Sequence, residues 1–240
     1  MRCLENIDVV ILAGGQGTRL RSAVPNLPKI LAPVRGRPIL DWQLNWLETF
    51  GPKKVTLSLG HLSKMVETYL EENRSWDFEI VTLTESKPLG TGGALLYCAS
   101  SCQQEYLLAL NGDTLLQADL CQFLEARSLA GTASSILCAK ISDPSPYGEV
   151  IIENDIVINF SEKKPVADAT SFVNAGCYIF NRNLLSKFSV CDAPSLEEDI
   201  LPALIKEGMA AYTKGVKFLD IGTPSGISLA NNPTTKIGNR

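Results

Sequence analysis

Near the N-terminus, an apolar run ends in clustered glycines that two arginines follow. The run is Val9–Leu12, and the cluster is Gly14-Gly15-Gln16-Gly17-Thr18-Arg19-Leu20-Arg21. This pattern is typical of a buried strand that stops in a tight loop. Glycines let backbone amides approach a ligand closely, and successive amides form a concave anion site. With the arginine charges beside it, the loop is predicted to bind a polyphosphate.

The common phosphate-loop templates do not fit this stretch. A Walker A loop needs Lys-Ser or Lys-Thr after its last glycine, and the dinucleotide fingerprint would need a glycine at Leu20. A positive charge is instead available at Lys29, which lies between Pro28 and Pro33. Because prolines stiffen the chain, this lysine can return to the same phosphate site.

The sequence resembles the sugar-1-phosphate nucleotidylyltransferases. The resemblance is carried by Gly-Gly-x-Gly-Thr-Arg-Leu-Arg, by Pro28-Lys29 and by Pro-Val-x-Gly-x-Pro-Ile-Leu at 33–40, and it extends from Val9 to about Ala230. Arg21-Ser22 and the Leu-Pro-Lys at 27–29 resemble the branch that makes GDP-D-glycero-D-manno-heptose. The resemblance implies one nucleotidyltransferase domain over 1–230 and a polar tail over 231–240. It also implies a Rossmann-like three-layer α/β fold with a mixed, mostly parallel central sheet.

The resemblance also implies roles for individual residues. Arg19 would neutralise the leaving pyrophosphate, and Lys29 would stabilise the charge around the α-phosphate. Lys163 would hold the incoming sugar phosphate. The nucleotide would contact Leu12, Ala13, Gly14, Gly15, Gly17, Thr18, Glu85, Gly90, Thr91 and Gly92. The sugar phosphate would contact Asn111, Gly148, Glu162, Lys163 and Asn174. Asp113 and Asp220 would hold Mg²⁺, which prefers carboxylate oxygens. Each aspartate alone is better explained as a turn former, and it is the pair in the family's order that favours a metal site.

Two further motifs have alternative interpretations. A carboxylate at Glu85 can accept hydrogen bonds from N1–H and N2–H of guanine, whereas uracil and thymine present carbonyl oxygens there. An exposed glutamate without a role explains Glu85 equally well on sequence alone, and the resemblance favours guanine. Ser195-Leu196-Glu197-Glu198-Asp199 matches a motif of the heptose branch. We interpret it as a helix start, with Ser195 as the N-cap and Glu198 completing a capping box, and without a chemical role.

The reaction implied is transfer of GMP from GTP to a sugar 1-phosphate, with Mg²⁺ as cofactor and pyrophosphate released. D-glycero-α-D-manno-heptose 1-phosphate is the first choice of acceptor, and its product would feed bacterial surface glycans. An alternative is a nucleotidylyltransferase whose acceptor is mannose 1-phosphate or another hexose 1-phosphate and whose donor is GTP, UTP or dTTP. A non-catalytic nucleotide-sugar-sensing subunit also stays open. A metal-dependent glycosyltransferase is disfavoured, because Asp113-Thr114-Leu115 lacks the second carboxylate of Asp-x-Asp.

Composition restricts the partners. The 240 residues are 45% hydrophobic with a net charge of −4, so a large core is expected and a nucleic-acid surface is not. No apolar segment could span a membrane, and acidic residues near the N-terminus argue against a signal peptide. We therefore expect a cytoplasmic protein whose partners are GTP and a sugar 1-phosphate; a homodimer stays open. The seven cysteines and single histidine predict reduced, mostly buried thiols rather than zinc sites or disulfides.

Strands and helices must position these residues. Apolar runs predict strands at 9–12, 54–59, 78–83, 106–110 and 133–140, and helical periodicity predicts helices at 39–50, 63–72, 94–101 and 119–129. This alternation is typical of a doubly wound parallel sheet. A hairpin at 148–160, strands within 172–180 and at 217–220, and helices at 196–206 and 225–230 are predicted to follow.

Overall fold

The computed structural model describes residues 2–15, 17, 26–141, 147, 149–161, 171–192 and 194–235. The strands are β1 (Asp8–Leu12), β2 (Pro33–Val34), β3 (Arg37–Pro38), β4 (Lys54–Leu59), β5 (Glu79–Thr84), β6 (Tyr106–Asn111), β7 (Thr114–Gln117), β8 (Ser134–Ile141), β9 (Glu149–Glu153), β10 (Ile156–Ser161), β11 (Ser171–Asn181), β12 (Met209–Tyr212) and β13 (Lys217–Asp220). The helices are α1 (Ile39–Glu48), α2 (Ser63–Glu72), α3 (Gly90–Ala99), α4 (Leu120–Ala130), α5 (Arg182–Leu185), α6 (Leu201–Lys206) and α7 (Pro224–Asn231), together with the 3₁₀ turn η1 (Lys29–Leu31) and the π-helical turn η2 (Leu196–Ile200). Among the described residues, no helix is long and apolar enough to cross a membrane.

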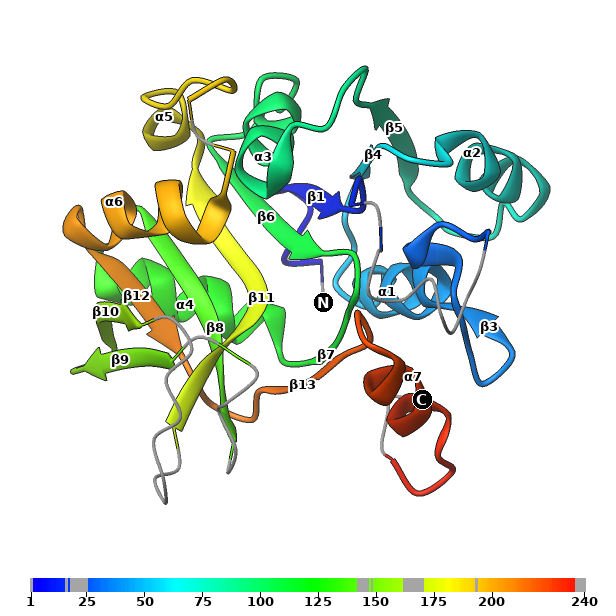
Figure 1. Ribbon diagram of the computed structural model, residues 1–240. Coiled ribbons are helices and arrows are strands. Elements are labelled where there is room, and N and C mark those ends of the chain that lie inside the picture. Colours follow the sequence, from blue (N-terminus) through cyan, green and yellow to red (C-terminus); the bar gives the residue numbers. More distant parts are fainter. Residues whose placement is uncertain are drawn as a thin grey trace.

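A nine-stranded sheet runs through the centre of the molecule (Figure 1), in the order β5-β4-β1-β6-β11-β8-β12-β10-β9. β5, β4, β1 and β6 are parallel neighbours, and β8 is parallel to β12. β11 is antiparallel to β6 and β8, and β10 is antiparallel to β12 and β9. Only these two strands of the sheet therefore run against the others, which confirms the mixed, mostly parallel sheet.

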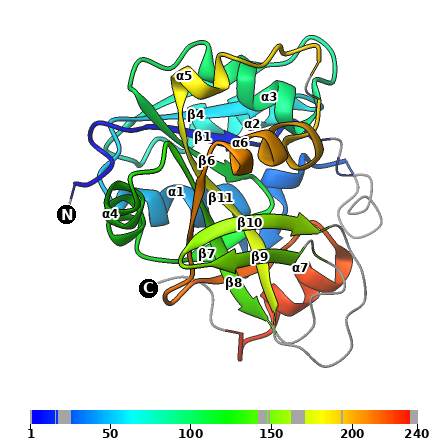
Figure 2. The same ribbon diagram turned by 90° about the vertical axis from the view of Figure 1, so that its left-hand side faces the viewer.

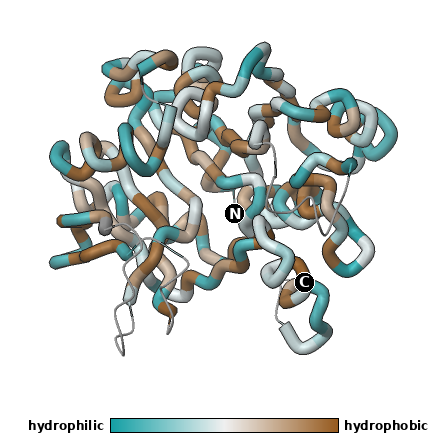
Figure 3. The backbone as a smooth tube through the Cα atoms, viewed as in Figure 1, coloured by the Kyte–Doolittle hydropathy of each residue, from teal (hydrophilic) through white to brown (hydrophobic). Residues whose placement is uncertain are grey.

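Helices cover both faces of the sheet and make three layers. In Figure 2, α3 and α5 lie above β1 and β4, and α1 and α4 lie below these two strands. The core on the α1 and α4 side includes Leu44 and Phe123, and the core on the α3 and α6 side includes Leu95 and Leu201. Hydrophobic residues are concentrated along the central strands (Figure 3), as burial of both sheet faces requires.

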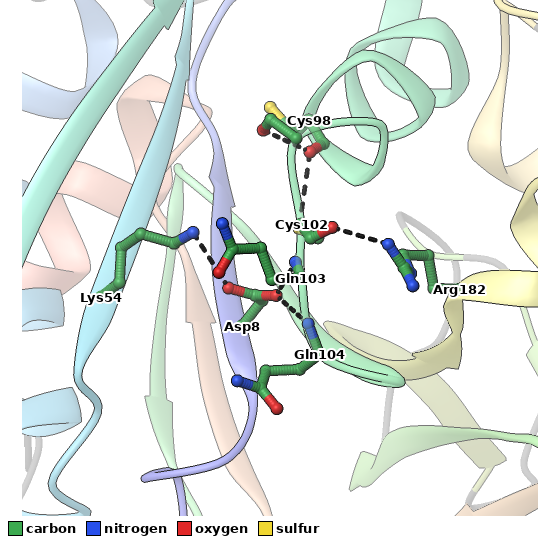
Figure 4. Close-up of polar contacts among 8 residues, drawn as sticks. Asp8, Lys54, Cys98, Cys102, Gln103, Gln104 and Arg182 are labelled. Carbon is green, nitrogen blue, oxygen red and sulfur yellow. Dashed lines mark hydrogen bonds and ion pairs between the residues drawn. The ribbon is translucent and has the colours of Figure 1, made fainter.

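A buried carboxylate ties strand β1 to its surroundings at the end of the sheet where the parallel strands begin (Figure 4). Asp8 is 5% exposed, and its Oδ2 accepts hydrogen bonds from the backbone amides of Gln103 and Gln104 at 2.7 Å each. Its Oδ1 lies 3.2 Å from Nζ of Lys54 on β4. Because the charge is both paired and hydrogen-bonded, burial is tolerated here.

The expectation that all thiols are reduced is wrong for one pair. Cys3 and Cys121 form a disulfide, with Cα atoms 5.5 Å apart and a sequence separation of 118. Residues so distant in sequence meet only because the N-terminal segment packs beside the start of α4, which spacing alone does not reveal. Cys98, Cys102, Cys138 and Cys177 are free and buried, as expected, and Cys191 is free and exposed.

Most predicted elements are present, but several boundaries differ. α3 begins at Gly90 rather than at residue 94, so the predicted loop at 90–93 is helical. Ser63 is not an N-cap: Leu62 has that position, with φ of 61° and no side-chain hydrogen bond. The short strands β2, β3, β7 and β12 were not expected.

The C-terminal segment is ordered beyond the predicted end of the last helix. α7 extends to Asn231, whose Oδ1 accepts a hydrogen bond from the backbone amide of Arg35 at 2.7 Å. The Arg35 guanidinium donates to the carbonyl oxygen of Asn232 at 2.7 Å. The part of the predicted polar tail at 236–240 lies outside the described residues.

Candidate active site

The candidate site lies at the sheet edge where four parallel strands end. Ala13–Gly15 follow β1, Gly60 follows β4, and Glu85 follows β5. β6 ends at Asn111 and is followed by Gly112 and Asp113. Ligands of open α/β sheets bind at this edge. The structure therefore brings the two predicted nucleotide loops and the Asp113 loop to one place.

The two predicted metal ligands approach each other through a second, smaller sheet. β13 pairs with β7 so that Asp220 lies opposite Thr114, the residue after Asp113. The amide of Ile221 donates to the carbonyl oxygen of Asp113 at 2.9 Å. Asp220 also accepts a hydrogen bond at Oδ1 from the amide of Gly222 at 2.7 Å, which fixes its side chain.

Gly222 marks the point where three charged side chains meet. A Cβ atom at this position would lie 2.6 Å from Nζ of Lys29, 2.8 Å from Oδ2 of Asp113 and 2.9 Å from Oδ1 of Asp220. Nζ of Lys29 is ion-paired with Oδ2 of Asp113, and the two side chains are 17% and 23% exposed. The absence of a side chain at 222 therefore leaves room for the ends of these three side chains to come together.

The glycine-rich loop packs closely on its neighbours. The amide of Ala13 donates to the carbonyl oxygen of Ser58 at 2.9 Å, and the amide of Gly112 donates to the carbonyl oxygen of Leu12, also at 2.9 Å. A Cβ at Gly60 would lie 2.5 Å from the carbonyl oxygen of Gly14. Gly15 is exposed, and Gly17, with φ of 59°, lies beside the Lys29 side chain.

Glu85 lies directly against this loop. Its Oε1 would be 2.6 Å from a Cβ at Gly14, so only glycine fits there without displacing the carboxylate. Oε2 accepts a hydrogen bond from the amide of Leu89 at 3.0 Å, and Oε1 accepts one from the Ser58 hydroxyl at 3.4 Å. The carboxylate thus shapes the loop at 85–89 as well as facing the glycine-rich loop.

The second nucleotide segment, Gly90–Gly92, forms the first turn of α3 and packs on a segment a hundred residues away. The amide of Gly92 donates to the carbonyl oxygen of Pro194 at 3.0 Å, and a Cβ at Gly90 would overlap that same oxygen. Gly90 has φ of 75°, a conformation that favours glycine. Close contact with the 194–197 segment, rather than with a ligand, explains this glycine in the structure.

Two of the predicted sugar-contacting residues are adjacent in the structure. β11 changes its register to β8 between Asn174 and Tyr178, and Gly176 in this bulge has φ of 70°. A Cβ at Gly176 would lie 2.8 Å from Nδ2 of Asn111. Asn174 donates to the Tyr178 hydroxyl at 2.6 Å and accepts from the Gly176 amide at 2.9 Å. Bulges of this kind re-aim side chains beside active sites.

Five predicted site residues lie outside the described residues: Thr18, Arg19, Gly148, Glu162 and Lys163. Tyr147, next to Gly148, packs its ring 5.0 Å from that of Phe218. Burial and then the nearby Asp220 charge raise the pKa of Tyr147. Tyr147 is thereby placed near Asp220.

Gln43 is a supporting residue that sequence reasoning missed. Its side chain is 4% exposed, and Nε2 donates to the carbonyl oxygens of Asn111 and Thr114, both at 2.9 Å. These two bonds hold the loop that carries Asp113. The available signal was a polar residue on the apolar face of α1, between Leu40 and Leu47.

The second missed residue is Glu197, to which the sequence assigned no chemistry. The Thr91 hydroxyl donates to its Oε2 at 3.2 Å. Burial, followed by the charges of Asp113 and Glu198, raises the pKa of Glu197, while its own amide and Thr91 oppose the rise. The predicted cap is confirmed in part: Ser195 accepts from the Glu198 amide at 3.1 Å, but Asp199 rather than Glu198 accepts from the Ser195 amide, at 2.7 Å. In a π-helical turn the backbone hydrogen bonds span one residue more than in an α-helix, so the carboxylate that accepts from the Ser195 amide belongs to the residue after Glu198.

The donor set suits a magnesium ion bound partly by substrate. Asp113 and Asp220 direct carboxylate oxygens at the same space beside Gly222. No group of three or more His, Cys, Asp or Glu side chains is placed to hold a metal within the described part of the chain. Magnesium commonly takes one or two carboxylates and completes its octahedron with phosphates and water, so this pair fits that ion.

A mixed sheet with a glycine-rich loop, a lysine and two aspartates at its carboxyl edge is the arrangement of a nucleotidyltransferase. The model of the nucleotidyl transferase family matches residues 8–237, and the chain belongs to this family. Relatives include a D-glycero-alpha-D-manno-heptose 1-phosphate guanylyltransferase of Aneurinibacillus thermoaerophilus, 34% identical over 220 residues, which cover 91% of this chain and 94% of the relative. A mannose-1-phosphate guanylyltransferase of Mycobacterium tuberculosis is 32% identical over 224 residues, covering 92% of this chain and 62% of that protein.

Solved structures agree with these relatives. HddC from Yersinia pseudotuberculosis superposes with a TM-score of 0.82 at 30% identity, covering 94% of this chain and 98% of HddC. HddC complexed with GMP-PN gives the same TM-score at 29% identity. The expected family and fold are thereby confirmed.

Proposed function

We propose that this protein transfers GMP from GTP to a sugar 1-phosphate, giving a GDP-sugar and pyrophosphate. The observation that carries the proposal is the convergence of Lys29, Asp113 and Asp220 beside Gly222, at the edge where the glycine-rich loop lies. Such a site suits a reaction between two anions, which must be neutralised before they can meet. Relatives named as guanylyltransferases support GTP as the donor.

The sugar phosphate supplies the nucleophile. One of its oxygens, already ionised at neutral pH, attacks the α-phosphorus of GTP while the bond from this phosphorus to the bridging oxygen of pyrophosphate breaks. Pyrophosphate leaves with that electron pair, so no general base is required. Catalysis then consists of positioning and charge stabilisation.

Each proposed role follows from position or from the family resemblance. Lys29 stabilises charge around the α-phosphate, which requires its ion pair with Asp113 to open. Arg19 neutralises the leaving pyrophosphate, and Lys163 holds the incoming phosphate. Asp113 and Asp220 would hold Mg²⁺, which supplies positive charge to the phosphates when bound.

Guanine recognition is proposed for Glu85. Its carboxylate lies against Gly14 at the start of the proposed nucleotide loop. A hydrogen bond from the Leu89 amide holds the carboxylate in this position. An acceptor pair at this position would favour the N1–H and N2–H edge of guanine.

The proposed acceptor is D-glycero-α-D-manno-heptose 1-phosphate. The relative named as a D-glycero-alpha-D-manno-heptose 1-phosphate guanylyltransferase supports this acceptor, because the similarity extends over 94% of that protein. Mannose 1-phosphate is the second candidate, which the mannose-specific relative at 32% identity supports. A regulatory subunit is disfavoured by the presence of Lys29, Asp113 and Asp220 together.

Pyrophosphate release from four NTPs, each paired with several sugar 1-phosphates, tests the proposal. GTP with the heptose 1-phosphate should give the highest kcat/KM. Release with UTP or dTTP in preference to GTP would contradict the donor, and release with none of the pairs would contradict the reaction.

We also propose that residues 1–230 form one domain, since the single nine-stranded sheet takes strands from Asp8 to Tyr212. A cytoplasmic location is proposed because GTP is available there. The Cys3–Cys121 disulfide is unusual for that compartment, where thiols are kept reduced. Counting free thiols after alkylation in intact cells tests the location and the disulfide together.

A further inference from the structure

Glu197 contacts the first turn of α3 and lies near residues that are proposed for both substrates. Its Oε2 accepts a hydrogen bond from the hydroxyl of Thr91, at the first turn of α3, on the proposed nucleotide side. Burial, and after it the Glu197 charge, raises the pKa of the Tyr178 phenol, which accepts a hydrogen bond from Asn174 on the proposed sugar side. Asp113 lies close enough for its charge to raise the pKa of Glu197 in turn.

The backbone holds this carboxylate in place. Glu197 lies in the π-helical turn η2, a local geometry that is frequent at functional sites. The amide of Leu196 donates to Oγ1 of Thr91 at 3.0 Å, so the same hydroxyl contacts both the backbone and the carboxylate of this turn. Gly92 and Pro194 add a backbone hydrogen bond between the two segments at 3.0 Å.

The Thr91 hydroxyl supplies one hydrogen bond to the Glu197 carboxylate, and because a carboxylate can accept several, a bound substrate can supply another. Phosphates would repel the carboxylate, and the described residues place no third carboxylate, histidine or cysteine with Asp113 and Asp220 to hold a metal. Neutral donors remain, and sugar hydroxyls are the donors that the proposed acceptor brings in large number. Carboxylates accept hydrogen bonds from hydroxyls strongly because the charge assists the bond.

We infer that Glu197 is a specificity-determining residue whose carboxylate accepts hydrogen bonds from hydroxyl groups on the ring of the sugar 1-phosphate. This inference rests on the proposed function and adds an acceptor-binding residue to it. Thr91 then acts as a positioning residue that orients the carboxylate from the nucleotide side.

The test compares Glu197→Gln with Glu198→Gln, its exposed neighbour in the same turn. Steady-state rates with GTP and the preferred sugar 1-phosphate give KM for each substrate. Glu197→Gln should raise KM for the sugar 1-phosphate about 10- to 100-fold, the usual loss for a charged hydrogen bond, and leave KM for GTP within about twofold. Glu198→Gln should change neither constant.

Deoxy analogues identify the hydroxyl concerned. A sugar 1-phosphate that lacks the contacted hydroxyl should bind the wild type and Glu197→Gln equally, whereas other deoxy analogues should keep the difference. Thr91→Val should produce a smaller rise in the same KM, and Thr91→Ser should restore it. If Glu197→Gln raises KM for GTP instead, or leaves both constants unchanged, the inference is overturned.

Calorimetric binding of the sugar 1-phosphate separates this inference from the proposed reaction. If the wild type releases no pyrophosphate with any substrate pair, the proposed function fails. Direct binding to wild type and Glu197→Gln still decides the role of Glu197: weaker binding by the variant supports it. Equal binding, or no binding by the wild type, overturns it.

Discussion

The ammonium group of Lys29 is ion-paired with the carboxylate of Asp113. The proposed reaction gives these groups different partners, the α-phosphate for Lys29 and magnesium for Asp113. In the structure the two charges neutralise each other, and the proposed roles require them to separate. The two side chains are only 17% and 23% exposed, so water screens their attraction less than it would at the surface.

Lys29→Met should lower kcat about 100- to 1000-fold, because it removes a positive charge from the transition state. It should also tighten Mg²⁺ binding, since Asp113 loses a competing cation. Turnover with GTP and calorimetric Mg²⁺ titration measure the two effects. Lys53→Met, which removes an exposed partner of Glu5, is the control and should alter neither. Normal turnover in Lys29→Met would contradict the role of the lysine.

Gly222→Ala and Gly226→Ala should affect different properties. A Cβ at Gly222 meets only the ends of the flexible side chains of Lys29, Asp113 and Asp220, whereas a Cβ at Gly226 overlaps the backbone carbonyl of Asp220. Gly222→Ala should therefore lower kcat at least about tenfold, because it displaces the charged groups. Gly226→Ala should lower the free energy of unfolding by about 2 kcal/mol through overpacking.

Activity assays and urea unfolding distinguish the two glycine variants. A Gly222→Ala enzyme with full activity would show that the space between the carboxylates is not used. Equal loss of stability in both variants would show that Gly222 serves packing alone.

Glu85→Gln should weaken the preference for GTP over UTP and dTTP about 10- to 100-fold, because one charged acceptor is lost from the guanine edge. The glutamine carbonyl oxygen can still accept from the Leu89 amide, so the loop should keep its shape. Ratios of kcat/KM for the three nucleotides measure the effect. Glu79→Gln, an exposed carboxylate at the start of β5, the strand that precedes Glu85, is the control. An unchanged ratio in Glu85→Gln would limit Glu85 to a structural role.

Gln43→Met should lower the free energy of unfolding by about 2 kcal/mol, because the buried carbonyl oxygens of Asn111 and Thr114 lose their donor. It should also lower kcat, since these bonds hold the Asp113 loop. Urea unfolding and turnover are measured side by side, with Gln103→Met at an exposed position as the control. Loss of stability with normal turnover would show that the loop keeps its position without Gln43.

Replacement of the disulfide by serines, Cys3→Ser with Cys121→Ser, should lower the free energy of unfolding by about 2–4 kcal/mol. The bridge joins residues 118 apart in sequence and so restricts a long segment of the unfolded chain. Thermal unfolding of oxidised, reduced and double-serine protein measures the effect, and Cys191→Ser, an exposed free cysteine, is the control. Equal unfolding temperatures in all forms would refute the stabilisation.

Strong hydrophobic patterns made much of the fold predictable. The limits of β4, α2 and β13 agree with the structure because apolar periodicity and turn residues define them. β12 was missed because Met209–Tyr212 is a four-residue run without β-branched residues, and pairing with β8 rather than local propensity makes it a strand. The first turn of α3 was missed because its glycines disfavour a helix, yet packing against Pro194 requires at least one of them.

The candidate site was predictable where a single motif carries the residue. Lys29, Asp113 and Asp220 were each predicted from a motif, and the structure brings them together, although sequence could not show that Lys29 pairs with Asp113. Gln43 and Glu197 were missed because their importance depends on what a buried polar group contacts across the fold. Such contacts join α1 to the end of β6 and η2 to α3, and no local pattern encodes them.

The order of the strands has a practical consequence for engineering. The residues proposed for the nucleotide precede residue 114, whereas Asn174 and Glu197 come from the later segments β11 and η2. With the exception of Asn111, the residues proposed for donor and acceptor thus lie in successive stretches of one chain, which meet where β6 pairs with β11. A library confined to β11 and η2 could therefore redirect the enzyme to new acceptors while the donor half is inherited unaltered.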